Sequence, residues 1–295
     1  LNGVCDADFY KSECICQPGY RGANCELKTL PFDFQTPNIN KRAGSYLKYR
    51  YVYHSDNRNS HTYDSYLKKS TKIQLLFRTR ENTTDRAQTL FQITSPNRAQ
   101  YVYLEIANNR LQFRYDIGGG ESLISIANVL INDGKWHMAK AERYGKEASL
   151  VLDDGEGFKL NYTFGLPNGA REMDVDRDSI FLGAKVVQIK VSGYEISRDY
   201  HDSCMMDVRF DDKPLPYTSL EEKAYEDIAI KMESVNVKDG CASTDYCKGI
   251  FCPSNQICVD QWRLGECQCP SGQILNGSRC EALSDCQLCF SEGTH

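Results

Sequence analysis

The sequence lacks a long apolar run, an excess of basic residues and the motifs of common enzyme families. No stretch approaches the ~18 consecutive apolar residues that a membrane-spanning helix needs. The net charge of −5 provides no positive field for nucleic acid or an acidic membrane surface, so we expect neither as a partner. No G-x-S-x-G, H-E-x-x-H or G-x-x-x-x-G-K-[ST] pattern occurs, so we expect no enzyme. No signal peptide begins the chain, which therefore reads as a piece of a longer protein.

Cysteine is almost absent from the middle of the chain and abundant at both ends. Of the 14 cysteines, only Cys204 lies between Glu26 and Gly240. The short ends cannot bury an adequate core without cross-links, whereas the long middle can build its own core. Zinc is the alternative use of cysteine, but the clusters contain no histidine and lack two well-spaced C-x2-C pairs. We therefore predict disulfides and an extracellular location.

The middle of the chain alternates between apolar and polar residues. In the segment KIQLLFRTR, Ile73, Leu75 and Phe77 alternate with polar side chains, and similar segments recur roughly every ten residues. This pattern predicts an antiparallel β-sandwich or barrel. The run from Ser219 to Glu222 matches a capping box and predicts a short helix that ends near Asp227.

Histidines offer the remaining candidates for metal binding or catalysis. His54 and His61 lie in the polar stretch YHSDNRNSHTYDSY, which we interpret as a long exposed loop rather than a metal site. His137 follows Trp136, and we expect it to be a structural histidine with satisfied hydrogen bonds rather than a general base.

The N-terminal cysteines follow the spacing C-x8-C-x-C-x8-C and end in CQPGYRGANC. Residues 1–26 resemble the C-terminal half of an EGF-like domain. The resemblance implies a disulfide between Cys16 and Cys25. It also implies that Cys5 and Cys14 have partners upstream of this sequence.

The central motifs are DGKWH at 133–137, Arg143, LVLD at 150–153, IFLG at 180–183 and CMMDVRF at 204–210. Together they resemble a laminin G domain, which we assign to residues 27–243. The resemblance implies an all-β fold, a curved, jelly-roll-like antiparallel β-sandwich flanked by small disulfide-rich modules. It also implies a disulfide between Cys204 and Cys241.

The last cysteines follow C-x4-C-x5-C-x8-C-x-C-x10-C, which resembles a complete EGF-like domain and is assigned to residues 244–281. The resemblance implies three disulfides: Cys247–Cys258, Cys252–Cys267 and Cys269–Cys280. Residues 282–295, with Cys286 and Cys289, resemble the start of a further EGF-like module, or form a tail.

The order EGF–laminin G–EGF, with RYGKEASLVLDDGEG and CKGIFCPSNQICVDQWRLGECQC, resembles the membrane-proximal region of invertebrate-type classical cadherins. The resemblance implies a non-catalytic ectodomain segment of a calcium-dependent cell–cell adhesion receptor, acting as a spacer or organising module. Its partners would be other modules of the same ectodomain. Homophilic contact would be made by cadherin repeats, and membrane attachment by a single transmembrane helix, both outside this sequence. The alternative is a ligand-binding laminin G module for a glycosaminoglycan or protein, as in neurexins or agrin.

The same resemblance bears on calcium. Calcium-binding laminin G domains commonly have an aspartate where this chain has Gln100, and a single acid, Asp245, precedes Cys247. Calcium needs several converging oxygen ligands. We therefore expect no cofactor in this segment, although calcium is expected in cadherin repeats of the parent protein.

Surface sites follow from short motifs and from charge. Asn82, Asn161 and Asn276 begin N-x-[ST] sequons and are predicted glycosylation sites. Basic residues on and near one predicted strand suggest a glycan-binding patch, with a solvated strand face as the alternative. The predicted patch comprises Lys68, Lys69, Lys72, Arg78, Arg80 and Arg114.

Overall fold

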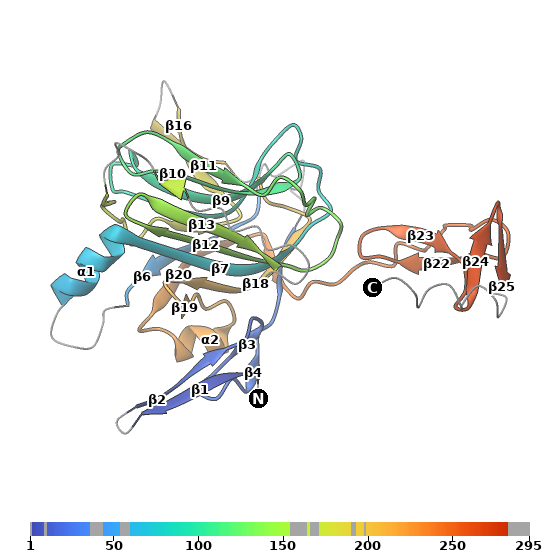
Figure 1. The fold of residues 1–295 in the computed structure, drawn as a ribbon, viewed down its shortest axis with the longest axis horizontal. Helices are drawn as coiled ribbons and strands as arrows, with labels where there is room; N and C mark the ends of the chain where they lie inside the picture. The colour runs from blue at the N-terminus through green and yellow to red at the C-terminus, as the bar shows by residue number, and fades with distance from the viewer. Residues whose placement is uncertain are drawn as a thin grey trace. The chain divides into compact units, whose positions relative to one another are not determined.

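The computed structural model describes residues 2–8, 11–35, 44–53, 60–153, 164–165, 171–189, 193–197 and 199–282 (Figure 1). The chain separates into two compact units, Leu1–Cys241 and Ala242–His295. The N-terminal cysteine-rich segment therefore belongs to the same unit as the sandwich. The finer division into an EGF half, a laminin G domain, an EGF-like domain and a tail remains a prediction.

Two antiparallel sheets form the body of the first unit. Within the described residues, one sheet has seven strands in the order β11–β10–β9–β8–β15–β6–β20: Ser122–Ser125, Arg110–Asp116, Tyr101–Ala107, Gln88–Thr94, Ile180–Leu182, Tyr46–Tyr51 and Ala229–Val235. The described part of the other sheet has the order β14–β13–β12–β7–β18–β5–β21, with β19 beside β18: Phe164–Gly165, Glu147–Leu152, His137–Tyr144, Ser70–Arg78, Ser203–Phe210, Phe32–Phe34, Val237–Asp239 and Lys213–Pro214. The predicted all-β sandwich is confirmed.

Short hairpins complete the described strands: β1–β2 (Gly3–Asp8, Lys11–Cys16), β3–β4 (Tyr20–Arg21, Leu27–Lys28), β16–β17 (Lys185–Ile189, Gly193–Ser197), β22–β23 (Ile257–Asp260, Gly265–Gln268) and β24–β25 (Gln273–Asn276, Arg279–Ala282). The last two pairs belong to the second unit.

The core lies between the two large sheets and is built by the predicted alternation. On β7, Ile73, Leu75 and Phe77 are buried while the residues between them are partly exposed. On β10, Leu111 and Phe113 enter the same core from the opposite sheet. Burial of each such side chain stabilises the fold by about 1.5–3 kcal/mol.

Strand β8 departs from this alternation because both of its faces are buried. The β16–β17 hairpin lies against its outer side, where the Gln92 side-chain carbonyl accepts a hydrogen bond from the Val186 amide at 2.6 Å. The Thr89 amide donates to the buried Asp199 carboxylate at 2.8 Å. The outer face of this sheet therefore carries a polar layer as well as a small apolar cluster around Phe181.

Helix α1 (Ser60–Lys69) occupies part of the stretch that we predicted to be an exposed loop, so that prediction was wrong for these residues. Tyr63 and Leu67 lie four residues apart on one helical face and pack against the sandwich core. Residues 54–59, including His54, lie outside the described part of the chain.

Arg143 on β12 holds the C-terminal end of α1. It is 1% exposed and donates hydrogen bonds to the Lys69 and Gly145 carbonyls, at 3.3 and 2.9 Å, and to the Thr71 hydroxyl at 3.0 Å. Burial lowers the pKa of Arg143 to about 10. A cation at this position complements the negative end of the helix dipole.

The predicted short helix is present as α2 (Ser219–Ala224), but its cap is shifted by one residue. The Thr218 hydroxyl accepts a hydrogen bond from the Glu221 amide, and the Glu221 carboxylate accepts one from the Thr218 amide. The helix also ends earlier than expected. Glu221, rather than Glu222, takes the capping position, and its second carboxylate oxygen lies 3.0 Å from Arg21.

Candidate functional site

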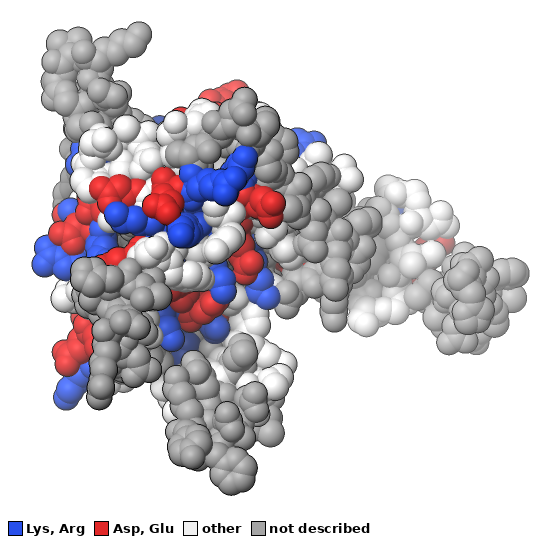
Figure 2. All heavy atoms as spheres, turned by 60° about the vertical axis from the view of Figure 1, so that its left-hand side comes forward, with Lys and Arg blue, Asp and Glu red and all other residues white. Residues whose placement is uncertain are grey.

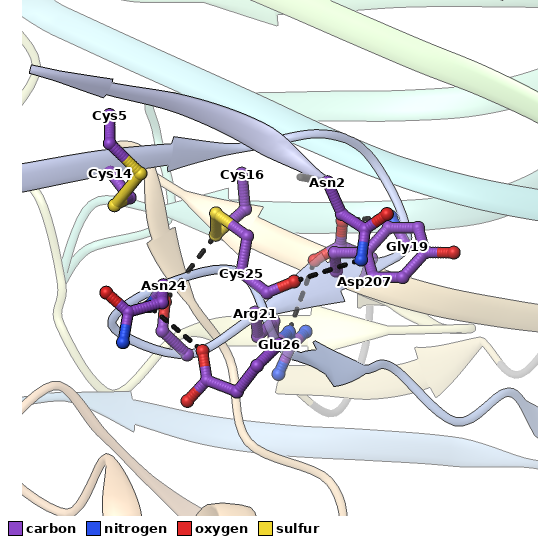
Figure 3. The surroundings of a disulfide bond; sticks show 12 residues. Asn2, Cys5, Cys14, Cys16, Gly19, Arg21, Asn24, Cys25, Glu26 and Asp207 are labelled. Atoms are coloured by element: carbon purple, nitrogen blue, oxygen red, sulfur yellow. Dashed lines mark hydrogen bonds and ion pairs between the residues drawn. A yellow bond between two sulfur atoms is a disulfide. The ribbon is translucent and has the colours of Figure 1, made fainter.

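The N-terminal hairpins are joined to the sandwich by a buried ionic cluster centred on Asp207 (Figure 3). The Asp207 carboxylate accepts hydrogen bonds from the Gly19 amide at 2.8 Å and from Arg21 Nε at 3.2 Å. Arg209 donates to both carboxylate oxygens, at 2.9 and 2.8 Å. We call Arg21, Asp207 and Arg209 the clamp.

A β-bulge places Asp207 in the clamp. The register between β18 and β7 shifts between Met206 and Arg209, and Asp207 has a φ of 49°. Aspartate tolerates this left-handed conformation better than most residues. The bulge therefore allows an acid inside an apolar strand to reach the hairpins.

The two arginines extend the clamp on both sides. Arg21 Nη1 lies 3.0 Å from Glu221 in α2, so the hairpins also contact the helix. Arg209 Nη2 donates to the Tyr20 carbonyl at 2.9 Å. Because the Asp207 side chain is fully buried and Arg21 is 7% exposed, the clamp is shielded from solvent. Removing one partner of a buried ion pair of this kind is destabilising, because the other charge stays buried.

A groove of about 1060 Å³ lies beside the clamp, between the hairpins, α1 and the β18–β19 turn. Its aromatic lining comprises Tyr20, Tyr53, Tyr63, Tyr66 and Tyr225. Tyrosine rings combine an apolar surface with a hydrogen-bonding end, which suits ligand contact. Charged residues of both signs line the remainder: Arg21, Lys140, Arg209, Asp211, Asp212 and Lys213.

The tyrosines are held in place by hydrogen bonds and cations. The Tyr63 hydroxyl donates to the Asp211 carboxylate at 2.5 Å and lies 2.8 Å from the Tyr51 hydroxyl. Burial raises the pKa of Tyr63, so its phenol stays protonated at physiological pH. Burial also raises the pKa of Asp211, against the opposing effect of the hydrogen bond from Tyr63. Arg177 packs over the rings of Tyr51 and Tyr63.

The residues of the predicted glycan-binding patch do not all lie on one sheet, and glycan binding by them stays a prediction. Arg114 lies on β10 in the seven-stranded sheet, whereas the other residues lie on or beside β7 in the other sheet. Four of the six form ion pairs: Lys68–Asp174 at 3.7 Å, Lys69–Glu172 at 3.6 Å, Lys72–Asp212 at 3.0 Å and Arg114–Glu105 at 2.8 Å. Arg78 donates to the Gly134 carbonyl. On the face shown in Figure 2, basic and acidic side chains interleave.

The structure contains six disulfides among the described cysteines. Five are the pairs expected from the resemblance: Cys16–Cys25, Cys204–Cys241, Cys247–Cys258, Cys252–Cys267 and Cys269–Cys280. The sixth joins Cys5 to Cys14, for which we expected partners upstream. The two residues lie directly opposite each other in the β1–β2 register, so a bond between them needs no other segment. Cys286 and Cys289 lie outside the described residues.

Two of the predicted glycosylation sites can be located. Asn82 and Asn276 are both exposed. The Asn82 side-chain carbonyl accepts a hydrogen bond from the Thr84 amide, and the Asn276 amide donates to Glu281. Asn161 lies outside the described residues. Attachment of glycans stays a prediction at all three positions.

His137 is buried between two carboxylates, in keeping with a structural role. Its Nδ1 lies 2.8 Å from Asp153 and its Nε2 lies 3.1 Å from Asp133. Burial lowers the pKa of His137, but the hydrogen bonds and charges of Asp153 and Asp133 outweigh it, and the net shift is upward. The two nitrogens point in opposite directions, so the carboxylates cannot converge with the ring on one ion.

Gln100 connects three segments at the end of the sandwich. Its side-chain amide donates to the Ile117 carbonyl at 2.7 Å and to the Glu172 carbonyl at 3.3 Å. Its carbonyl accepts from the Asp174 amide at 2.9 Å. Both ends of the Gln100 side-chain amide are thus engaged by backbone groups.

We therefore predict that millimolar calcium leaves the melting temperature of this chain nearly unchanged. A site with a dissociation constant of ~10 μM would add about 2.7 kcal/mol at a hundredfold excess, which thermal unfolding detects easily. The control is the same titration of Gln100→Asp. An upward shift in the unaltered chain that a chelator reverses would refute the prediction.

Sequence reasoning missed the clamp and the groove. The signal for the clamp was Asp207 itself, an acid between the apolar residues Met206 and Val208. The groove has no comparable signal, because its tyrosines come from separate segments that only the fold brings together.

Comparisons with known proteins agree with this architecture. The laminin G domain profile matches residues 77–213. Neural-cadherin from Drosophila melanogaster is 32% identical over 279 residues, which cover 93% of this chain and 8% of that protein. Human Protocadherin Fat 1 is 25% identical over 96% of this chain and 6% of its own length. Mouse laminin alpha1 domains LG4-5 superpose with a TM-score of 0.51 at 20% identity, over 80% of this chain and 49% of theirs.

The sandwich, the disulfides and these matches define an extracellular module that contains a laminin G domain. The relatives are adhesion or binding proteins without catalytic activity. Over nearly its whole length the chain is similar to these cadherins, which is consistent with an EGF–laminin G region of the cadherin family. It spans less than a sixth of the curated cadherins it matches first: 8% of Neural-cadherin and 14% of Putative neural-cadherin 2. Among the described residues, no helix is long and apolar enough to cross a bilayer.

Proposed function

We propose that this chain is a non-catalytic spacer and organising segment in the ectodomain of a calcium-dependent cell–cell adhesion receptor. A single transmembrane helix outside this sequence would anchor the receptor, and cadherin repeats elsewhere would make the homophilic contact. The direct partners of this segment would be neighbouring modules of the same ectodomain. Similarity to Neural-cadherin over 93% of the chain supports this assignment.

The clamp is the observation that carries the proposal. A spacer must hold the modules on either side of it in a defined orientation, and the default between small modules is relative motion. Here the N-terminal hairpins are tied to the sandwich through three hydrogen-bonded charged groups, Arg21, Asp207 and Arg209. Such charged hydrogen bonds are directional, so they favour one relative orientation.

We expect beads coated with this chain to stay dispersed, with or without calcium. Homophilic adhesion needs a central apolar anchor that enters a pocket on the partner. Phe77, Phe91 and Phe113, which are among the largest fully buried side chains of the described residues, instead pack in the core. Beads coated with the cadherin repeats of the parent receptor serve as the positive control. Calcium-dependent clustering of beads that carry this chain alone would transfer the adhesive function to this segment.

The groove favours ligand binding as a second candidate function. Asp211 and Asp212 line it next to Lys213 and Lys140, so a protein segment with mixed charges suits it better than a sulfated glycosaminoglycan. In the same bead assay, fluorescent heparin added at physiological salt should not be retained. Retention that requires Lys140 and Lys213 would instead support the glycosaminoglycan alternative.

A further inference from the structure

Glu81, His201 and Asp202 lie together at one end of the eight-stranded sheet, away from the groove residues. Strands β7 and β18 pair antiparallel, with Cys204 opposite Arg78. The two chains remain side by side beyond that pair, since the Ser203 hydroxyl donates to the Thr79 hydroxyl at 2.7 Å. Glu81 lies three residues after the end of β7, and His201 lies two residues before the start of β18.

The three side chains offer a converging set of metal ligands. One imidazole nitrogen and one carboxylate oxygen each from Glu81 and Asp202 all lie within 4.8 Å of one another. His201 Nδ1 is 3.7 Å from Asp202 Oδ2. Ligands of one tetrahedral zinc ion, bound at about 2.0–2.2 Å, lie roughly 3.3–3.5 Å apart. Coordination of one ion therefore requires these side chains to rotate closer together.

A second observation points to a ligand at this position. The His201 side chain is 30% exposed, but its Nδ1 atom is buried and has no hydrogen-bond partner among the described residues. The 3.7 Å separation from Asp202 is too long for one. A buried polar atom without a partner is unfavourable, and a coordinate bond to a metal would satisfy it.

The donor types indicate which metal fits. Calcium and magnesium take oxygen ligands, whereas imidazole nitrogen suits zinc and other late first-row transition metals. Two carboxylates and one neutral imidazole would balance the charge of a divalent cation. Three protein ligands also leave one tetrahedral position for water, as in open zinc sites.

We propose that Glu81, His201 and Asp202 form a zinc-binding site that joins the segment after β7 to the segment before β18. Bound zinc links two parts of the chain that are 120 residues apart in sequence, from Glu81 to His201. It lies close to the Cys204–Cys241 disulfide and adds a second cross-link to that end of the sheet. This site is independent of the proposed spacer function.

The test uses the whole chain without a histidine tag, stripped of metal with a chelator. Titration with zinc chloride should show one zinc per chain by calorimetry and raise the melting temperature, and the same concentration of calcium chloride should do neither. His201→Ala and Glu81→Gln should each weaken zinc binding more than about tenfold, as expected for loss of a ligand. His61→Ala, which removes a histidine that is not one of the three proposed ligands, is the matched control and should bind zinc normally.

Folding of the variants is checked in the metal-free state. His201→Ala should melt at the same temperature as the unaltered chain in chelator, so a lost zinc response reports on the site rather than on misfolding. Equal zinc affinity in the unaltered chain and His201→Ala would overturn the proposal. Absence of stoichiometric binding in the unaltered chain would also overturn it.

Discussion

Replacing Asp207 with alanine should release the N-terminal hairpins from the sandwich. The substitution leaves Arg21 and Arg209 without the carboxylate that both bind. Breaking a buried ion pair by removing one partner typically costs about 3–5 kcal/mol, because the remaining charge is uncompensated. Arg21 keeps Glu221 as a partner, so the charge that loses its carboxylate partner is that of Arg209. The hairpins are expected to separate from the sandwich, since separation lets water reach both guanidinium groups.

Amide hydrogen exchange measures this release directly. The Gly19 amide donates to Asp207, so peptides that contain it should exchange much faster in Asp207→Ala. Arg21→Ala should have a smaller effect, because Arg209 and the Gly19 amide still satisfy the Asp207 carboxylate. Arg50→Ala, which removes an exposed ion pair with Asp178, is the control and should leave the exchange unchanged. Unchanged protection of Gly19 in Asp207→Ala would show that the clamp does not hold the hairpins.

Removing the Cys204–Cys241 disulfide with a double alanine substitution should destabilise the sandwich by about 4 kcal/mol. This value follows from the loop-closure entropy for a sequence separation of 37 residues. The bond connects β18, at the centre of the eight-stranded sheet, to the chain just after β21 at its edge. The loss therefore acts on the cooperative unfolding of the whole sandwich.

Denaturant unfolding followed by tryptophan fluorescence separates the two units. In a Trp262→Phe background, Trp136 reports on the sandwich alone. The matched control removes Cys269–Cys280, which closes a shorter loop in the second unit. That control should leave the Trp136 transition in place. Equal shifts from both double variants would mean that the two units unfold together.

The strands were predictable where one face of a strand is buried and the other is solvated. In β7 and β10, Ile73 and Phe113 belong to alternations that the sheet pattern alone imposes. Helix α1 was missed because its sequence is polar except at Tyr66 and at the two residues that pack against the core, Tyr63 and Leu67. Those two side chains stabilise a helix only when the sandwich is present to bury them.

The candidate sites were less predictable from the sequence than the strands. Six basic residues near one predicted strand suggested a patch. In the structure Lys72 forms an ion pair with Asp212, and Arg114 lies on the opposite sheet. Cys5 and Cys14 matched a domain pattern in which each has a partner elsewhere, whereas the hairpin register places them opposite each other. Spacing along the chain does not specify which side chains meet across it.

The sequence by itself determined the all-β sandwich, the cysteine-rich ends and the similarity to the cadherin EGF–laminin G region. These features rest on local alternation and on spacing, which are properties of neighbouring residues. Only the tertiary structure decided the clamp between Arg21 and Asp207, the tyrosine groove and the meeting of Glu81 with His201. Each of these depends on strand pairing and burial over long sequence separations, which set the distances and the local dielectric that give charged groups their roles.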